Sequence, residues 1–224
     1  MPGMERALVI GSSGGIGSAL VAALRERRVD VVGLSRRDDG LEITDESSVA
    51  QLLGALDPPF DLVITATGAL VVDGAEPEKA LREITAEGLL GQFRVNTLGP
   101  ALVLKHAVRL LPRNQHSVFA ALSARVGSIG DNRLGGWHSY RASKSALNQL
   151  VHGASIELAR THKHAIAVCL HPGTVATPFT ADYAGHHRTV TPEEAAGKLL
   201  NVVESLEPSD NGGFFDYAGR RIPW

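Results

Sequence analysis

Residues 7–17 read ALVIGSSGGIG, an apolar run that ends in a glycine-rich turn. The run is typical of a buried strand, and Gly11, Gly15 and Gly17 permit a tight turn that leads into a helix. Because glycine has no side chain, backbone N–H groups of this turn can approach a pyrophosphate, which the positive helix end also favours. The stretch therefore predicts a strand–turn–helix unit that binds a dinucleotide. The alternative, a glycine turn without a ligand, is disfavoured by its position at the first strand–helix junction.

Short apolar runs alternate with longer helical patterns through the rest of the chain. Further strands are expected at 31–35, 62–67, 117–122, 165–170 and 212–217, and helices at 18–28, 44–56, 77–111 with a break near Gly99-Pro100, 139–160 and 192–206. Strands that are apolar throughout and separated by helices indicate a parallel sheet covered on both faces. Residues 1–224 are therefore expected to form a single dinucleotide-binding domain of the α/β class, a doubly wound, Rossmann-like parallel sheet with helices on both faces.

The composition is that of an ordinary globular chain: of 224 residues, 44% are hydrophobic and 21% charged. The net charge of −2 gives no electrostatic reason to expect nucleic acid or an anionic membrane as a partner. No apolar run is long enough to span a membrane, the first residues lack a signal-peptide core, and the single cysteine, Cys169, suits a reducing compartment. We therefore expect a cytoplasmic protein. The nine histidines lack the spacing of metal ligands, so no metal site is expected.

The second expected strand leads into Ser35, Arg36 and Arg37, where dinucleotide-binding sheets contact the adenosine ribose. Enzymes that use NAD usually carry an acid there, whereas a guanidinium can bind the 2′-phosphate of NADP. Arg36 therefore favours NADP(H) as the cofactor. The alternative is a solvated basic turn, because Asp38 and Asp39 follow at once and could neutralise the arginines.

Two further features join the glycine turn. Tyr140 and Lys144 open a long helix in GWHSYRASK (136–144), and Pro172-Gly173 follow the next strand. With the spacing Gly-x-x-x-Gly-x-Gly, they make the chain resemble the short-chain dehydrogenase/reductase family from end to end, and ASKSALNQL (142–150) and VNTLGP (95–100) support this. The insert GSIGDNRLGGW (127–137) and the C-terminal NGGFFDYAGRRIPW (211–224) resemble the subgroup of sniffer-type carbonyl reductases and C-factor-like proteins.

The resemblance implies an NADP(H)-dependent oxidoreductase that reduces a carbonyl to an alcohol, or the reverse, by hydride transfer with a Tyr/Lys/Ser/Asn proton relay. Tyr140 would be the general acid in reduction and the base in oxidation. A free phenol has a pKa near 10, and a cation within about 4–6 Å can lower it by roughly 1–3 units. Lys144, one turn further on the same helix face, would tune the phenol and hold the nicotinamide ribose. Asn96 would anchor the proton relay through water.

The serine that completes the site has more than one candidate. The family places a hydroxyl three residues before a glycine, which puts Ala124 at that position and Ser123 one place earlier. Ser123 is the preferred candidate, because the long insert absorbs its separation from the tyrosine and a strand end or bulge can redirect its side chain. Ser128, in a sequence typical of a loop, is the alternative, and a site without a serine is the third.

The resemblance also implies where the cofactor is bound. The expected contacts are Gly11, Ser13, Gly15, Ile16, Gly17, Arg36, Glu42, Ile43, Thr67, Gly68, Tyr140, Lys144, Val175 and Thr177. Glu42 and Ile43 would lie beside the adenine, and Thr177 and the Val175 backbone beside the nicotinamide carboxamide. The chain departs from the family at Ile10, where a threonine is usual, and at TATG (65–68), which replaces Asn-Asn-Ala-Gly.

The substrate would be a small molecule with a carbonyl or alcohol group. The loop 178–191, which carries Phe179 and Tyr183, is expected to form a wall of its pocket. A homodimer or homotetramer is expected through helices near 100–112 and 140–160. Two other functions are possible for such a chain. The first is an NADP(H)-binding sensor or signalling protein, against which the intact tyrosine and lysine argue. The second is a nucleotide-sugar epimerase-like enzyme, for whose substrate domain 224 residues leave little room.

Overall fold

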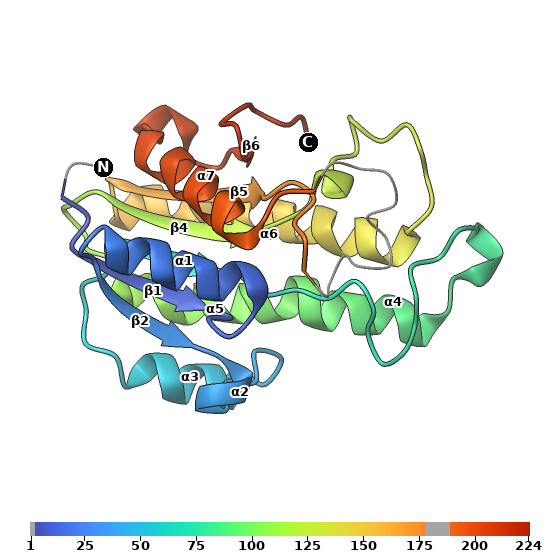
Figure 1. Cartoon of the computed structure of the whole chain (residues 1–224), viewed down its shortest axis with the longest axis horizontal. Helices are drawn as coiled ribbons and strands as arrows, with labels where there is room; N and C mark the ends of the chain where they lie inside the picture. Colours follow the sequence, from blue (N-terminus) through green and yellow to red (C-terminus); the bar gives the residue numbers. More distant parts are fainter. Residues whose placement is uncertain (1–2, 178–188) are drawn as a thin grey trace.

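The computed structural model describes residues 3–177 and 189–224, which are organised around a six-stranded parallel sheet (Figure 1). The strands lie in the order β2-β1-β3-β4-β5-β6. Their bounds are β1 Arg6–Ile10, β2 Asp30–Leu34, β3 Leu62–Thr65, β4 Ser117–Leu122, β5 Ala165–His171 and β6 Phe214–Asp216. β2 and β3 flank β1 on opposite sides, and doubly wound sheets bind ligands at the carboxyl ends of strands where the order reverses in this way.

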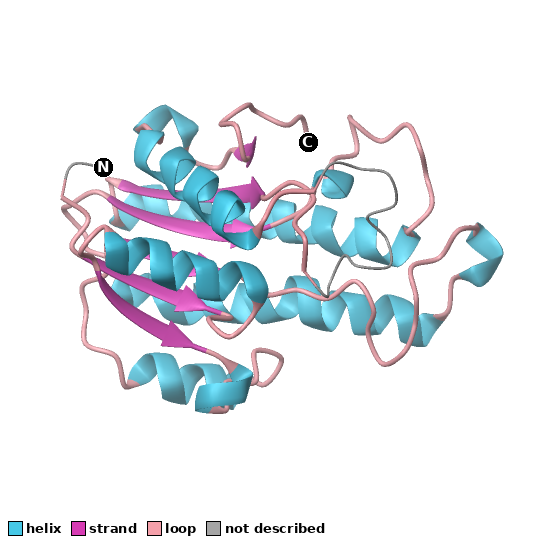
Figure 2. Ribbon diagram, viewed as in Figure 1, coloured by secondary structure: helices cyan, strands magenta, loops and turns pink. Residues whose placement is uncertain are grey.

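Helices cover both faces of the sheet (Figure 2). One face packs against α1 Gly15–Glu26 and α7 Pro192–Ser205, and the other against α3 Glu46–Gly54, α5 Gly99–Ala107 and α6 His138–Thr161. Alternate residues of β1 supply the two cores: Leu8 and Ile10 face α3, α5 and α6, whereas Ala7 and Val9 face α1 and α7. The predicted doubly wound α/β fold is thus confirmed. None of the helices in the described ranges is long and apolar enough to cross a membrane.

The helix that follows β3 begins later than the sequence pattern predicted. We expected a helix over 77–111, but 77–85 forms a loop with one short 3₁₀ turn, and helix α4, Ala86–Phe93, starts after it. Thr85 sets this start, because its hydroxyl accepts a hydrogen bond from Gly88 N at 3.0 Å. A local capping bond therefore decided the boundary, and apolar periodicity did not reveal it.

The helix also continues where we expected a break at Gly99-Pro100. A π-helical segment, Arg94–Leu98, joins α4 to α5. Proline has no N–H and its ring crowds the carbonyl four residues earlier, and the wider π turn accommodates both effects. Gly99 precedes the proline in a helical conformation, with φ −54° and ψ −58°, which the absence of a Cβ permits. The segment contains Asn96, which we expected to anchor the proton relay.

A short helix that the sequence did not reveal, α2 Arg36–Asp39, follows β2. Ser35 caps it, since its hydroxyl accepts a hydrogen bond from Asp38 N at 3.0 Å. Gly40 ends it in a left-handed conformation with φ +72°. The helix fixes the arginine turn that the sequence placed near the cofactor.

Candidate active site

The turn after β1 keeps its shape through close backbone contacts. Gly11 has a φ of +86°, which glycine adopts without strain, and its N–H donates to Leu34 O at 2.8 Å. Gly14 N donates to Gly11 O at 3.0 Å, and a Cβ at Gly17 would overlap that same oxygen. The packing of the turn therefore requires glycine at both Gly11 and Gly17.

Helix α1 presents a positive end that its own sequence does not cap. Gly14 precedes the helix and offers no side-chain cap, and the first turn carries no acidic residue. The backbone N–H groups there are therefore suited to an anion. Gly15, Ser13 and Ile16, which we expected to contact the cofactor, belong to this turn and are exposed or half-buried.

Two threonines, in the segments that follow β3 and β5, border the glycine turn. A Cβ at Gly11 would lie 2.9 Å from Thr67 Cγ2, and a Cβ at Gly15 would lie 2.7 Å from Thr177 Cγ2. The Thr67 hydroxyl is buried and has no hydrogen-bond partner within the described residues. A buried, unsatisfied hydroxyl beside an uncapped helix start fits a polar ligand with anionic groups. The residues present therefore fit the NADP(H) expected from the sequence.

Arg36 lies at the end of the neighbouring strand, β2, with 82% of its side chain exposed. The two acids that could neutralise it are engaged elsewhere: Asp38 pairs with Arg37 at 2.8 Å, and Asp39 accepts a backbone N–H of the turn at 2.8 Å. Arg36 forms an ion pair with Glu42 at 3.8 Å. A pair this long and exposed holds the guanidinium weakly, so Arg36 is accessible to a ligand phosphate.

The residues expected beside the adenine differ in how their side chains are used. Glu42 Oε1 accepts hydrogen bonds from Thr44 N at 3.1 Å and Thr44 Oγ1 at 2.9 Å. Ile43 is buried in the core, and a Cβ at Gly99 would lie 2.6 Å from its Cδ1. Val175 is likewise buried. For Ile43 and Val175, a ligand contact therefore has to come from the backbone.

Tyr140 and Lys144 lie one turn apart at the start of α6 and are both buried, with 6% and 3% of their surface exposed. Lys144 Nζ donates to Leu122 O at 3.0 Å and lies 5.9 Å from the centre of the Tyr140 ring. Burial lowers the pKa of Lys144 to about 8 and raises the pKa of Tyr140. The lowered phenol pKa expected from the sequence is therefore not found, because burial disfavours the phenolate. A phenol that keeps its proton is suited to act as an acid.

Asn96 and Lys144 meet at Gly68, in the segment after β3. A Cβ at Gly68 would lie 3.0 Å from Asn96 Oδ1 and 3.2 Å from Lys144 Nζ. The Asn96 amide clamps the next residue: Oδ1 accepts from Ala69 N at 2.9 Å, and Nδ2 donates to Ala69 O at 2.8 Å. Gln92 Oε1 accepts a further hydrogen bond from Nδ2 at 2.6 Å. Asn96 therefore fixes the backbone that lies beside the Lys144 ammonium.

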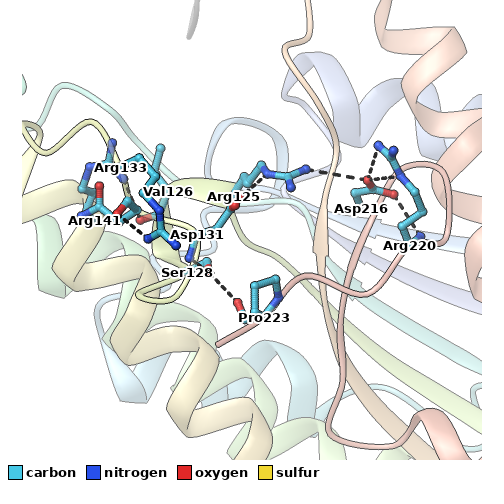
Figure 3. A network of polar contacts seen from close by, with 10 residues as sticks. Arg125, Val126, Ser128, Asp131, Arg133, Arg141, Asp216, Arg220 and Pro223 are labelled. Atoms are coloured by element: carbon cyan, nitrogen blue, oxygen red, sulfur yellow. Dashed lines mark hydrogen bonds and ion pairs between the residues drawn. The ribbon is translucent and has the colours of Figure 1, made fainter.

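The hydroxyl groups of both candidate serines are engaged in other bonds. Ser123 Oγ donates to Asn148 Oδ1 at 2.7 Å. Asn148 Nδ2 donates to Gly127 O at 3.3 Å, which fixes the amide orientation and leaves Ser123 as the donor. Ser128 Oγ donates to Pro223 O in the C-terminal segment (Figure 3). A catalytic role for either serine requires exchange of its present bond for one to a substrate, and that role stays a prediction.

Sequence reasoning missed a polar network that ties the loop after β4 to the end of β6 (Figure 3). Asp216 is buried and accepts from Arg220 Nε at 2.9 Å, and Arg125 Nη1 lies 3.9 Å from the same carboxylate. Arg125 also pairs with Asp131. It also missed Glu78, which contacts the start of α6. Arg125 and Asp216 lie far apart in the chain, as do Glu78 and Ser139, so no local pattern could have revealed these two connections.

The two aromatic residues expected to line the substrate pocket, Phe179 and Tyr183, lie outside the described residues. Within the described parts of the chain, no group of three or more His, Cys, Asp or Glu side chains is placed to hold a metal ion. The residues that are described bring a protonated phenol, an amine with a pKa of about 8 and a free helix start to one edge of the sheet. This set can bind an anionic dinucleotide and deliver a proton beside it.

Relatives in sequence match from about two thirds of the chain to nearly all of it. A family model described as enoyl-(acyl carrier protein) reductase matches residues 11–207. The chain is 30% identical over 236 residues to 1-hydroxy-2-glutathionyl-2-methyl-3-butene dehydrogenase of Rhodococcus sp. (strain AD45), which covers 99% of this chain and 100% of the relative. It is 33% identical over 145 residues to the C-signal of Myxococcus xanthus, which covers 65% of this chain and 84% of the relative.

Solved structures share the fold. Carbonyl reductase Sniffer of D. melanogaster aligns with a TM-score of 0.80 and 22% identity, over 99% of this chain and 100% of that chain. The NADPH-bound carbonyl reductase from chicken fatty liver aligns with a TM-score of 0.82 and 22% identity, over 99% of this chain and 94% of that chain. At this identity the likeness concerns the fold, and the chemistry has to be argued from the site itself.

Proposed function

Because the chain belongs to the short-chain dehydrogenase/reductase family, as its motifs predicted, we propose that it is an NADP(H)-dependent oxidoreductase that reduces a carbonyl to an alcohol or catalyses the reverse. The observation that carries the proposal is the buried pair of Tyr140 and Lys144. Thr67 borders the glycine turn and the adjacent Gly68 borders Lys144, so the acid and the anion-binding helix start lie at the same edge of the sheet.

The proposed residues divide the reaction between them. When bound, the reduced nicotinamide supplies a hydride to the carbonyl carbon. Tyr140 donates its phenolic proton to the carbonyl oxygen as negative charge develops there. Its raised pKa keeps that proton in place until the oxygen becomes basic. Lys144, with a pKa of about 8, is largely protonated at neutral pH and stabilises the phenolate that remains.

The binding residues support a preference for NADP(H). The glycine turn and the start of α1 would hold the pyrophosphate, and the unsatisfied Thr67 hydroxyl would bind the adenosine half. Arg36 would pair with the 2′-phosphate, because its guanidinium is exposed and only weakly held. The chicken carbonyl reductase, which has the same fold, was solved with NADPH bound.

The substrate and assembly proposals follow from the relatives and from exposed apolar side chains. The Rhodococcus relative is named for a hydroxyl-bearing substrate, and the two solved neighbours are carbonyl reductases, so a small carbonyl or alcohol compound is the proposed substrate. A homodimer or homotetramer built on the π-helical segment and α6 is supported by apolar side chains that are exposed on these helices, namely Leu98, Leu150 and Ile156. The single cysteine, Cys169, supports a cytoplasmic location.

A panel of carbonyl substrates, followed by the loss of NADPH absorbance, tests the proposal. Tyr140→Phe keeps the ring and deletes the proton, so kcat should fall by roughly 10²- to 10⁴-fold on the best substrate. Binding of NADPH should change little, because the hydroxyl is not its main anchor. Tyr217→Phe is the matched control, since it deletes the phenol of a residue after β6 whose ring packs against His171, with ring centres 6.5 Å apart, and which has no proposed part in the proton transfer.

The outcomes separate the proposed enzyme from the two other functions. Near-wild-type kcat in Tyr140→Phe would refute the assignment of the acid. Tight NADPH binding without turnover of any carbonyl would indicate a sensor, and turnover of a nucleotide sugar would indicate an epimerase-like enzyme.

A further inference from the structure

Helix α6, which carries Tyr140 and Lys144, begins without a cap from its own sequence. Trp137, the residue before it, has a left-handed conformation with φ +51°, and its side chain does not cap the helix. No acidic residue occupies the first turn. The first N–H groups of this 24-residue helix therefore need acceptors from elsewhere in the chain.

Glu78, in the loop between β3 and α4, supplies such acceptors. Its Oε2 accepts from Ser139 N at 3.1 Å, its Oε1 accepts from the Ser139 hydroxyl, and its main-chain oxygen accepts from Trp137 N. Only 8% of the residue is exposed. Burial alone would raise the pKa of the carboxyl, but the hydrogen bonds from Ser139 lower it below its ordinary value. Glu78 is therefore charged at neutral pH, and a carboxylate is favoured at a helix N-terminus.

The loop around Glu78 is built to keep it in this place. Glu83 Oε2 accepts hydrogen bonds from Lys79 N at 2.7 Å and Ala80 N at 3.3 Å, which closes the turn directly after Glu78. Pro77, on the other side, is buried and restricts the backbone before it enters Glu78. The carboxylate is thus held at the start of α6 from both sides.

The partners of Glu78 both adjoin Tyr140. Ser139 precedes it directly, and the Trp137 ring packs edge-on against the Tyr140 ring, with centres 6.2 Å apart and an angle of 69° between the planes. Both partners are bonded to Glu78. Fixing the first turn of the helix fixes the direction of the phenol relative to Lys144, one turn later.

We propose that Glu78 is a positioning residue for Tyr140, which it orients through Ser139 and Trp137 without touching the reacting atoms. The inference rests on the proposed oxidoreductase function, in which Tyr140 donates the proton. Under this proposal, the loop between β3 and α4 contributes to catalysis by holding Tyr140 in its orientation.

Kinetics of substituted enzymes test the proposal. Glu78→Ala should lower kcat by about 10- to 100-fold, the scale of effect that a small misplacement of a reacting group produces, and leave KM for NADPH within about threefold. Glu78→Gln retains one acceptor oxygen, so its kcat should fall between wild type and Glu78→Ala. In a Tyr140→Phe background, Glu78→Ala should lower kcat little further, because the donor it orients is gone.

A control and a second readout separate this role from general stability. Glu76→Ala removes an exposed carboxylate of the same loop and should leave kcat within about twofold of wild type. Hydrogen exchange of a peptide covering 137–141 should be faster in Glu78→Ala than in wild type, but unchanged in Glu76→Ala. Hydrogen exchange can be measured in both variants without knowledge of the substrate.

The outcomes distinguish failure of the inference from failure of the proposed function. With an active wild type, unchanged kcat in both Glu78 variants or unchanged exchange at 137–141 would overturn the inference and leave the function intact. A wild type that binds NADPH but reduces no carbonyl would overturn the function and with it the catalytic part of the inference. If Glu78→Ala does not fold, the comparison of Glu78→Gln with wild type decides.

Discussion

Replacement of Arg36 by alanine should weaken the binding of NADPH much more than that of NADH. The two cofactors differ by the 2′-phosphate of the adenosine ribose, which doubly wound dinucleotide-binding sheets contact at the end of the second strand. Arg36 lies at that position, and its charge is not cancelled by Asp38 or Asp39, which bond to Arg37 and to a backbone N–H. A phosphate at this place would therefore meet an available guanidinium.

The contacts of Arg36 set the size of the effect. A hydrogen bond between charged groups contributes about 1.5–3 kcal/mol. Forming it sacrifices the exposed pair with Glu42, 3.8 Å long, and such pairs are worth about 0.2–1 kcal/mol. The difference of about 0.5–2.8 kcal/mol corresponds to roughly a 2- to 100-fold loss of NADPH affinity in Arg36→Ala, since 1.4 kcal/mol is a factor of ten. Affinity for NADH should change by less than about twofold.

Calorimetric dissociation constants for both cofactors, in wild type and variants, provide the assay. Arg37→Ala is the matched control, because it removes the adjacent guanidinium that Asp38 already holds at 2.8 Å. Glu42→Gln should strengthen NADPH binding, since it frees Arg36 and removes a charge that repels the phosphate. Arg36 does not bind the 2′-phosphate if Arg36→Ala keeps the wild-type ratio of the two dissociation constants, or if Arg37→Ala shifts that ratio as strongly.

Two further predictions concern the catalytic edge of the sheet. Ser123→Ala should lower kcat/KM by at least roughly tenfold, whereas Ser128→Ala should stay within a few-fold of wild type; the reverse ranking in steady-state assays would show that the loop is wrongly aligned. Lys144→Met should raise the stability of the cofactor-free protein below pH 8. In that range Lys144 carries its charge in both the folded and the unfolded state, so folding of the wild type bears the full cost of burying the charge. The difference between the unfolded-state pKa of 10.5 and the folded-state pKa of about 8 corresponds to a burial cost of roughly 3 kcal/mol, which the methionine avoids. The methionine also loses the hydrogen bond to Leu122 O, which offsets about 1 kcal/mol of this gain in stability. This advantage should decline between pH 8 and 10.5, where only the unfolded chain still holds the proton, and a pH-independent difference in melting temperature would contradict it.

The sequence was sufficient where the information is local. The glycine turn was predictable because Gly11 and Gly17 are needed by a few neighbouring backbone atoms. The shared face of Tyr140 and Lys144 followed from helical spacing alone. Strands β4 and β5 were predictable because they are apolar over almost their whole length, as central parallel strands are.

The features of the site that could not be predicted from the sequence depend on contacts between residues far apart in the chain. The direction of the Ser123 hydroxyl is decided by Asn148, which only the packing of α6 brings into contact. The pKa of Tyr140 is decided by burial, which a count of nearby charges omits. The loop 77–85 was read as helix because its apolar residues have helical spacing, although Glu78 is held by a helix 61 positions away.

The single cysteine, Cys169, allows transient opening of the sheet to be measured by chemical modification. Cys169 lies in β5 between Ala121 of β4 and Phe214 of β6, none of it is exposed, and burial raises the pKa of its thiol to about 12. Because a thiol reacts as its thiolate, alkylating reagents reach it only in molecules whose sheet has transiently separated. A ligand that binds only the folded state reduces the population of those molecules in proportion to its concentration over its dissociation constant. The rate of alkylation at different cofactor concentrations therefore measures cofactor affinity. The measurement needs no substrate, and no reporter group has to be introduced into the protein beforehand.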